Sequence, residues 1–76
     1  MRVIERNRWT VYLEINRDRE GGWILRIEDG RGSATVWTDP FATEQAALEA
    51  ALKAIDTEGI ESFIGPDSEL RIFFDA

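Results

Sequence analysis

Apolar and polar residues alternate in two segments of the first half of the chain. Over residues 9–16 and again over residues 23–28, every second residue is apolar, and most residues between them are polar or charged. A period of two places neighbouring side chains on opposite faces of an extended chain, which is typical of a strand with one buried face. The positions predicted to face a core are Trp9, Val11, Leu13, Ile15, Trp23, Leu25 and Ile27.

Turn residues separate these two strands and lead to a third. Residues 17–22 are polar and end in two glycines, and residues 29–32 contain two more. Glycine accepts the positive φ that tight turns need. Residues 33–38 are rich in β-branched side chains and predict a third strand, but their pattern does not assign its faces. Three strands joined by short turns form an antiparallel meander.

Residues 43–59 have the pattern of one capped helix. The hydroxyl of Thr43 can cap the first turn, and Gly59 suits the position after the last turn. Apolar residues recur between them at the spacing of a single helix face. This predicted core stripe consists of Leu48, Ala51, Leu52 and Ile55, widened by Ala47 and Ala54.

A last strand is predicted over residues 69–75, with Leu70, Ile72 and Phe74 on one face and Arg71 and Phe73 on the other. The element order predicts one α+β domain over residues 1–76. It is a βββαβ fold with a three-stranded antiparallel meander, one helix packed on one sheet face and a fourth, C-terminal strand. Residues 1–8 form a loose N-terminal arm or the start of the first strand. The last strand can pair with either edge of the meander, and beside the third strand it would run parallel to it.

The composition limits the chemistry that this chain can perform. The 76 residues include no cysteine and no histidine, which excludes disulfides and the usual zinc sites. No apolar run approaches the ~20 residues of a membrane span. No signal-peptide pattern opens the chain, so we expect a cytoplasmic protein. We also expect no cofactor.

The net charge of −6 is concentrated in the second half of the chain. Residues 1–38 hold seven arginines and six acidic residues, whereas residues 39–76 hold two basic and nine acidic residues. An acidic surface repels phosphate, so nucleic acid is not an expected partner, while a basic protein is a suitable one. The simpler interpretation is that the charge keeps a small domain soluble.

One helix covers only one face of a four-stranded sheet. The opposite face is predicted to carry Tyr12, Ile24, Arg26, Trp37, Arg71 and Phe73. An exposed apolar face commonly marks a protein contact, here with a second copy of the chain. Two alternatives remain open: the N-terminal arm or residues 60–68 fold over this face, or its aromatic residues stack on single-stranded RNA.

Carboxylates are the groups left for acid–base or metal chemistry. Glu28, Asp29 and Asp39 fall at predicted strand ends, where acidic side chains can bind Mg²⁺. A carboxylate-dependent metal enzyme is therefore an alternative hypothesis. The simpler interpretation is that Asp29 and Asp39 begin turns and accept hydrogen bonds from nearby amides. We assign no catalytic residue and no metal ligand, and we expect a protein that is not an enzyme.

Two segments resemble the HicB-type antitoxin fold, a reduced ribonuclease-H-like βββαβ domain. They are Glu20-Gly-Gly-Trp23 continuing to Ile27-Glu-Asp29, and the capped helix from Thr43 to Leu52. The chain lacks the Pro-Asp and Gly-Cys elements around that family's third strand, so the resemblance does not extend to promoter binding. It implies a non-catalytic, oligomeric protein that covers a small basic partner. The sequence thus predicts a small non-catalytic interaction module that self-associates through an apolar sheet face, with an antitoxin-like or regulatory role toward a basic partner.

Overall fold

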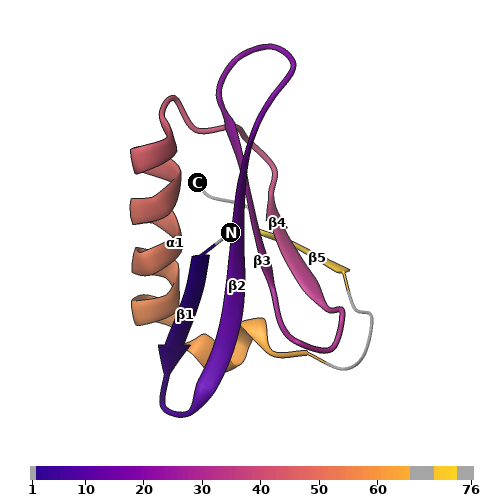
Figure 1. Ribbon diagram of the computed structural model, residues 1–76, viewed down its shortest axis with the longest axis vertical. Coiled ribbons are helices and arrows are strands. Elements are labelled where there is room, and N and C mark those ends of the chain that lie inside the picture. Colours follow the sequence, from indigo (N-terminus) through magenta and orange to yellow (C-terminus); the bar gives the residue numbers. More distant parts are fainter. Residues whose placement is uncertain (1, 66–69, 74–76) are drawn as a thin grey trace.

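The computed structural model describes residues 2–65 and 70–73 (Figure 1). In these residues, five strands form one sheet and a single α-helix lies against it. A short 3₁₀ helix, η1, follows the α-helix. The elements in chain order are β1 Arg2–Arg6, β2 Trp9–Arg17, β3 Trp23–Glu28, β4 Ala34–Trp37, α1 Glu44–Glu58, η1 Ile60–Phe63 and β5 Leu70–Phe73.

The α+β class and the order of meander, helix and final strand are confirmed. The sheet order is β1-β2-β3-β4-β5, in which β1 to β4 pair antiparallel. The final strand pairs in parallel with β4, beside the third strand of the predicted meander. A helical crossover is the connection that parallel neighbours need, and α1 with η1 supplies it. Among the described residues, no helix is long and apolar enough to cross a membrane.

The N-terminal segment is a regular strand rather than a loose arm. It forms a hairpin with β2 in which Arg6 pairs with Trp9 across a two-residue turn. The turn residues Asn7 and Arg8 have φ values of 53° and 69°. Positive φ at both positions is the type I′ geometry that matches the twist of a hairpin. Arginine rarely adopts positive φ. Because neither turn residue is glycine, the sequence contains no signal for this turn.

The core lies between α1 and one sheet face, here called the inner face. Val11, Leu13, Leu25 and Ile27 are at most 1% exposed, and the helix meets them with three alanines and Ile55. Leu48 and Leu52, predicted as core, are only half-buried. The small side chains of Ala47, Ala51 and Ala54 allow a close approach of the helix, which turns the two leucines to its flank.

Both predicted helix caps are present. The Oγ1 of Thr43 accepts a hydrogen bond from the backbone N of Ala46 at 3.0 Å. At the other end, Gly59 has φ 85° and donates its N–H to the carbonyl of Ile55 at 2.9 Å. These bonds satisfy backbone groups that a helix end leaves without partners. The helix therefore begins and ends where its sequence signals predict.

Trp37 lies in the core, which corrects its predicted place on the opposite face. Its side chain is 3% exposed and stacks on Phe63 of η1, with ring centroids 6.2 Å apart and an interplanar angle of 16°. Ile60 is buried in the same cluster. Residues 60–63 therefore extend the core on the helix side, instead of covering the far face of the sheet as one alternative proposed.

The faces of the final strand also differ from the prediction. Ile72, predicted to face the core, is 56% exposed and pairs in register with Val36. Because Trp37 faces the helix, its neighbour Val36 faces the opposite side of the sheet. Ile72 pairs in register with Val36 and therefore lies on the same side as Val36. Phe74 lies outside the described residues, and so do the side chains of Leu70, Arg71 and Phe73.

Candidate interaction surface

The sheet face opposite α1, here called the outer face, combines apolar and charged side chains. The strand registers place Glu14 beside Arg26, Arg26 beside Val36, and Val36 beside Ile72. Tyr12 lies beside Glu28 in the adjacent row. The described residues that the registers place on the outer face include Val3, Glu5, Thr10, Tyr12, Glu14, Asn16, Ile24, Arg26, Glu28, Ala34, Val36 and Ile72.

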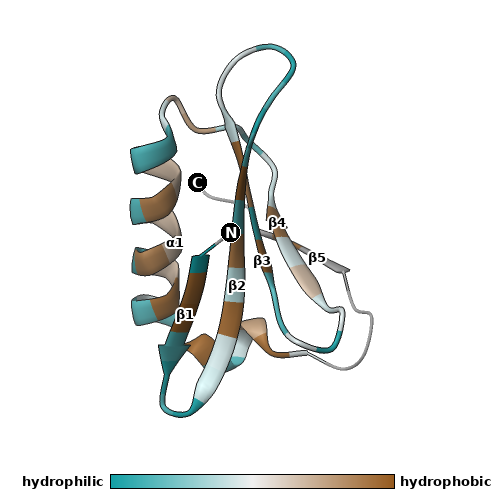
Figure 2. Cartoon of the chain, in the orientation of Figure 1, coloured by the Kyte–Doolittle hydropathy of each residue, from teal (hydrophilic) through white to brown (hydrophobic). Residues whose placement is uncertain are grey.

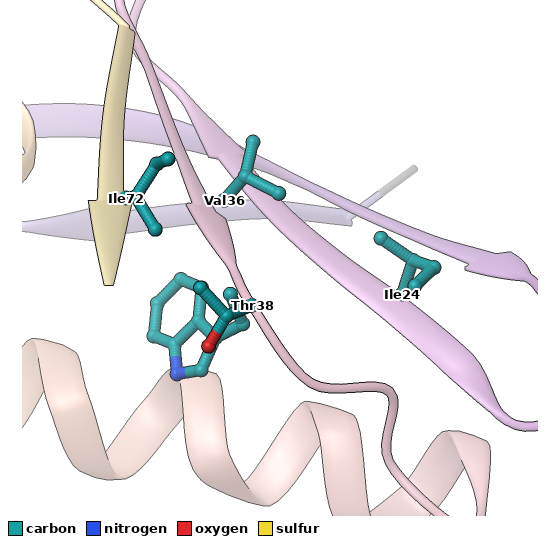
Figure 3. Close-up of a pocket in the computed structure, with 5 residues that line it drawn as sticks. Ile24, Val36, Thr38 and Ile72 are labelled. Carbon is teal, nitrogen blue, oxygen red and sulfur yellow. The ribbon is translucent and has the colours of Figure 1, made fainter. Parts of the chain in front are cut away.

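An apolar hollow lies at the β3–β5 side of the outer face. It has a volume of about 360 Å³ and is lined by Ile24, Val36, Trp37, Thr38 and Ile72. Figure 3 shows that the three aliphatic side chains come from three neighbouring strands, with Ile72 on β5, Val36 on β4 and Ile24 on β3. Beta-branched residues at alternating positions of adjacent strands build this hollow because the sheet register aligns them.

Charged groups border the hollow on the β2–β3 side. The Nε of Arg26 lies 2.8 Å from the Oε1 of Glu28, two residues along the same strand. This Nε is shielded from solvent and has no partner with hydrogen-bond geometry, so the contact is an ion pair. Glu14 pairs with Arg26 across β2 and β3. Both signs of charge therefore stand next to an apolar surface.

The structure brings together half of the predicted surface residues. Tyr12, Ile24 and Arg26 are half-buried residues of the outer face, as expected. Trp37 is wrongly placed in that set, because its side chain is buried in the core, although the residue also lines the hollow. Arg71 and Phe73 pair in register with Thr35 and Trp37, and their side chains are not described.

Sequence reasoning missed Val3, Val36 and Ile72 as outer-face residues. Val36 could have been found from its neighbour Trp37. A large aromatic side chain is a good candidate for the core, and the next residue of a strand then faces the opposite way. Val3 belongs to a strand that lacks a glycine turn signal. Both residues follow from the register once β1 and β4 are placed in the sheet.

Asp29 makes structural hydrogen bonds, which agrees with its predicted role in a turn. Its Oδ1 accepts from the backbone N of Arg31 at 2.8 Å and of Ser33 at 2.9 Å. Its Oδ2 accepts from the backbone N of Gly65 at 3.1 Å. Three amide donors already occupy this carboxylate, which is 4% exposed as a residue.

The other two carboxylates of the metal hypothesis lie apart from this arrangement. Glu28 pairs with Arg26, and Asp39 is exposed. Within residues 2–65 and 70–73, no three acidic side chains gather where they could hold a metal ion. The described residues therefore do not bring Glu28, Asp29 and Asp39 together in one acidic cluster.

Comparison with protein-family models, with curated proteins and with solved structures found no match to this chain. The HicB-type resemblance therefore stays a prediction from two segments of sequence. A functional assignment must come from the surface of the molecule.

Proposed function

We propose that this protein is a non-catalytic interaction module that binds a second copy of itself through the outer face. The observation that carries the proposal is the apolar hollow lined by Ile24, Val36 and Ile72. The side chain of Ile72 is 56% exposed. Burying apolar surface stabilises a complex by roughly 25 cal/mol per Å². In the described part of the chain, α1 packs on the inner face and no helix lies on the outer face (Figure 1).

The charges beside the hollow suit a second copy better than a partner of one sign. Each outer face offers the cation Arg26 and the anions Glu14 and Glu28. In a two-fold pair, Arg26 of each copy can face an acidic side chain of the other copy. A partner carrying only basic or only acidic groups would leave one of them opposed by a like charge.

The size of the molecule sets how much of the outer face must take part. The molecule measures 34 × 24 × 22 Å, and each partner in a standard interface buries about 800 Å² of accessible surface. The apolar hollow alone is too small for a stable dimer. The interface therefore includes the charged row and Tyr12 as well as the hollow.

The free sheet edge at β1 is a weaker site for self-pairing. Three of its five residues are charged, namely Arg2, Glu5 and Arg6. A two-fold antiparallel pairing centred on Ile4 would set Arg2 opposite Arg6 of the second copy. Charged side chains on an edge strand discourage such strand addition. This favours contact through the face rather than through the edge.

A small basic protein is an additional partner that the net charge of −6 supports. The dimer would then act in an antitoxin-like or regulatory manner, as the resemblance to HicB-type antitoxins implies. This part of the proposal is tested by titrating a basic protein at increasing salt, because an electrostatic complex weakens as the salt concentration rises.

The self-association is tested with two variants that add the same charge at different places. Ile72→Asp puts a carboxylate in the hollow, and Thr57→Asp puts one at an exposed helix position. Light scattering coupled to gel filtration should show a monomer for Ile72→Asp and an unchanged mass for Thr57→Asp. Equal masses for the two variants would contradict the proposed surface.

A further inference from the structure

Strand β5 lies at the edge of the sheet and, among the described strands, pairs with β4 alone. Its parallel register runs from Ala34 beside Leu70 to Trp37 beside Phe73. Ile72, the side chain of β5 that the structure describes, is 56% exposed. A hairpin fixes its register through a tight turn, whereas parallel neighbours are joined by a long crossover. Something other than a turn must therefore set the register of β5.

The hollow of the outer face depends on this register. Val36 pairs with Ile72, which places both aliphatic side chains on the outer face with Ile24. A shift of β5 by one residue would turn Ile72 toward the opposite side of the sheet. The hollow would then lose one of its three aliphatic side chains.

Asp29 contacts both the beginning of β4 and the chain that leads to β5. It directly follows β3 and is 4% exposed. Its Oδ1 accepts a hydrogen bond from the backbone N of Ser33 at 2.9 Å, and Ser33 directly precedes Ala34, the first residue of β4. Its Oδ2 accepts from the backbone N of Gly65 at 3.1 Å. One carboxylate thus connects the entrances of two parallel neighbours.

The short chain between Gly65 and β5 makes this connection restrictive. Leu70 follows Gly65 by five residues, and five residues reach at most about 18 Å. On the other side of Gly65, η1 is anchored in the core by Ile60 and Phe63. Figure 2 shows apolar colouring at both ends of η1. The bond to Asp29 adds a fixed point between this anchor and β5.

This fixed point has a direction that apolar packing lacks. Phe63 stacks on Trp37, but an apolar contact tolerates small shifts along the chain. A hydrogen bond needs a donor at the correct distance and angle. The Oδ1 of Asp29 already accepts from the amides of Arg31 and Ser33, so the carboxylate cannot turn to follow a displaced Gly65.

We propose that Asp29 is a positioning residue for the interaction surface: its carboxylate sets the register of β5 on β4 and thereby holds Ile72 in the hollow. Asp29 is not among the residues that line the hollow, so it acts through β5. The effect on self-association rests on the function proposed above. The effect on the register stands by itself.

Asp29→Asn separates the two roles of the carboxylate. The remaining side-chain oxygen can still accept from the turn amides, whereas an N–H₂ group facing the N–H of Gly65 cannot accept from it. Thr43→Ala is the control, because it removes another hydrogen bond from backbone to side chain, at the opposite end of α1 from η1. Both variants lose stability, but only Asp29→Asn loses a contact at the entrance of β5.

Nuclear Overhauser effects between backbone protons of β4 and β5 read the register directly. The natural sequence and Thr43→Ala should both show the contact between Val36 and Ile72. Asp29→Asn should lose it while keeping the contacts between β2 and β3. The proposal is overturned if this contact persists in Asp29→Asn, if it also disappears in Thr43→Ala, or if the natural sequence lacks it.

Asp29→Ser covers the case in which the asparagine variant does not fold. Serine can still accept from turn amides, but its side chain is too short to reach Gly65 as well. It should give the same loss of contacts between β4 and β5. If neither variant folds, the proposal is wrong, because it requires α1 and the other strands to form without the bond to Gly65.

Light scattering relates the register to self-association. Asp29→Asn should weaken self-association at least about tenfold, whereas Thr43→Ala should leave it unchanged at a temperature at which both variants are folded. Equal association of Asp29→Asn and the natural sequence would overturn the link between Asp29 and the interaction surface. If the natural sequence is itself a monomer, the proposed function fails, and the backbone contacts still decide whether Asp29 sets the register.

Discussion

Asp29 and Gly65 are joined by a hydrogen bond across 36 residues of the chain. The backbone N of Gly65 donates to the Oδ2 of Asp29 at 3.1 Å, while the Oδ1 of the same carboxylate holds the β3–β4 turn. One side chain thus shapes a turn and fixes the segment that follows η1. Because η1 brings Phe63 to Trp37, this bond also supports the packing beneath β4.

Asp29→Asn should lower the free energy of unfolding by about 1–3 kcal/mol, the cost of leaving a buried polar group without a partner. The amide keeps one oxygen for the turn but presents an N–H₂ group to one of the backbone donors. Urea unfolding measures the loss. Asp39→Asn is the matched control, since Asp39 is exposed and should change stability by less than about 0.5 kcal/mol. Equal effects for both variants would contradict the role of Asp29.

Gly21 and Gly22 offer a comparison of two adjacent glycines with similar backbones. Their φ values are 91° and 85°, so alanine at either position is strained by about 1–2 kcal/mol. A Cβ at Gly21 would meet no atom within 4 Å, whereas at Gly22 it would lie 3.0 Å from the Cβ of Pro40 and 3.1 Å from the carbonyl oxygen of Phe41. Gly22→Ala should therefore be the more destabilising substitution.

Thermal unfolding of the two alanine variants checks this order. The bridge between Trp23 and Phe41, with two backbone hydrogen bonds of 2.8 Å, holds the crowded segment close to Gly22. If Gly21→Ala melts at the same temperature as Gly22→Ala, or lower, then Pro40 and Phe41 can shift to accommodate the added Cβ, and the expected order is wrong.

Phe63→Leu should destabilise the protein by about 1 kcal/mol and change the fluorescence of the buried Trp37. The substitution keeps an apolar side chain in the core but removes the ring that stacks on the indole. Val3→Ala is the control, because Val3 is 61% exposed and should be close to neutral. An emission spectrum that stays the same in Phe63→Leu would be inconsistent with the stacked pair.

Much of the fold follows from local signals in the sequence. The alternation around Leu13 and Leu25 predicts β2 and β3 with the correct inner face, because a period of two leaves one choice once the core is identified. Thr43 and Gly59 predict both ends of α1, since each forms a bond with a nearby backbone group.

The features that the sequence did not predict depend on tertiary packing. The inward direction of Trp37 requires Phe63, which joins it only after the helix crosses the sheet. Once Trp37 turns inward, the parallel register directs Ile72 outward, so a single side chain changes the predicted surface. Strand β1 was missed because Asn7 and Arg8 adopt positive φ without a glycine.

The molar mass of the natural sequence over a range of concentrations tests the central claim most directly. One chain has a mass of 8.7 kDa. If the outer face binds a second copy, the molar mass measured by light scattering should rise with concentration to at least twice that value. Added salt should shift the concentration at which the mass rises, because charged groups border the hollow. A mass that stays at 8.7 kDa up to the highest attainable concentration would contradict self-association.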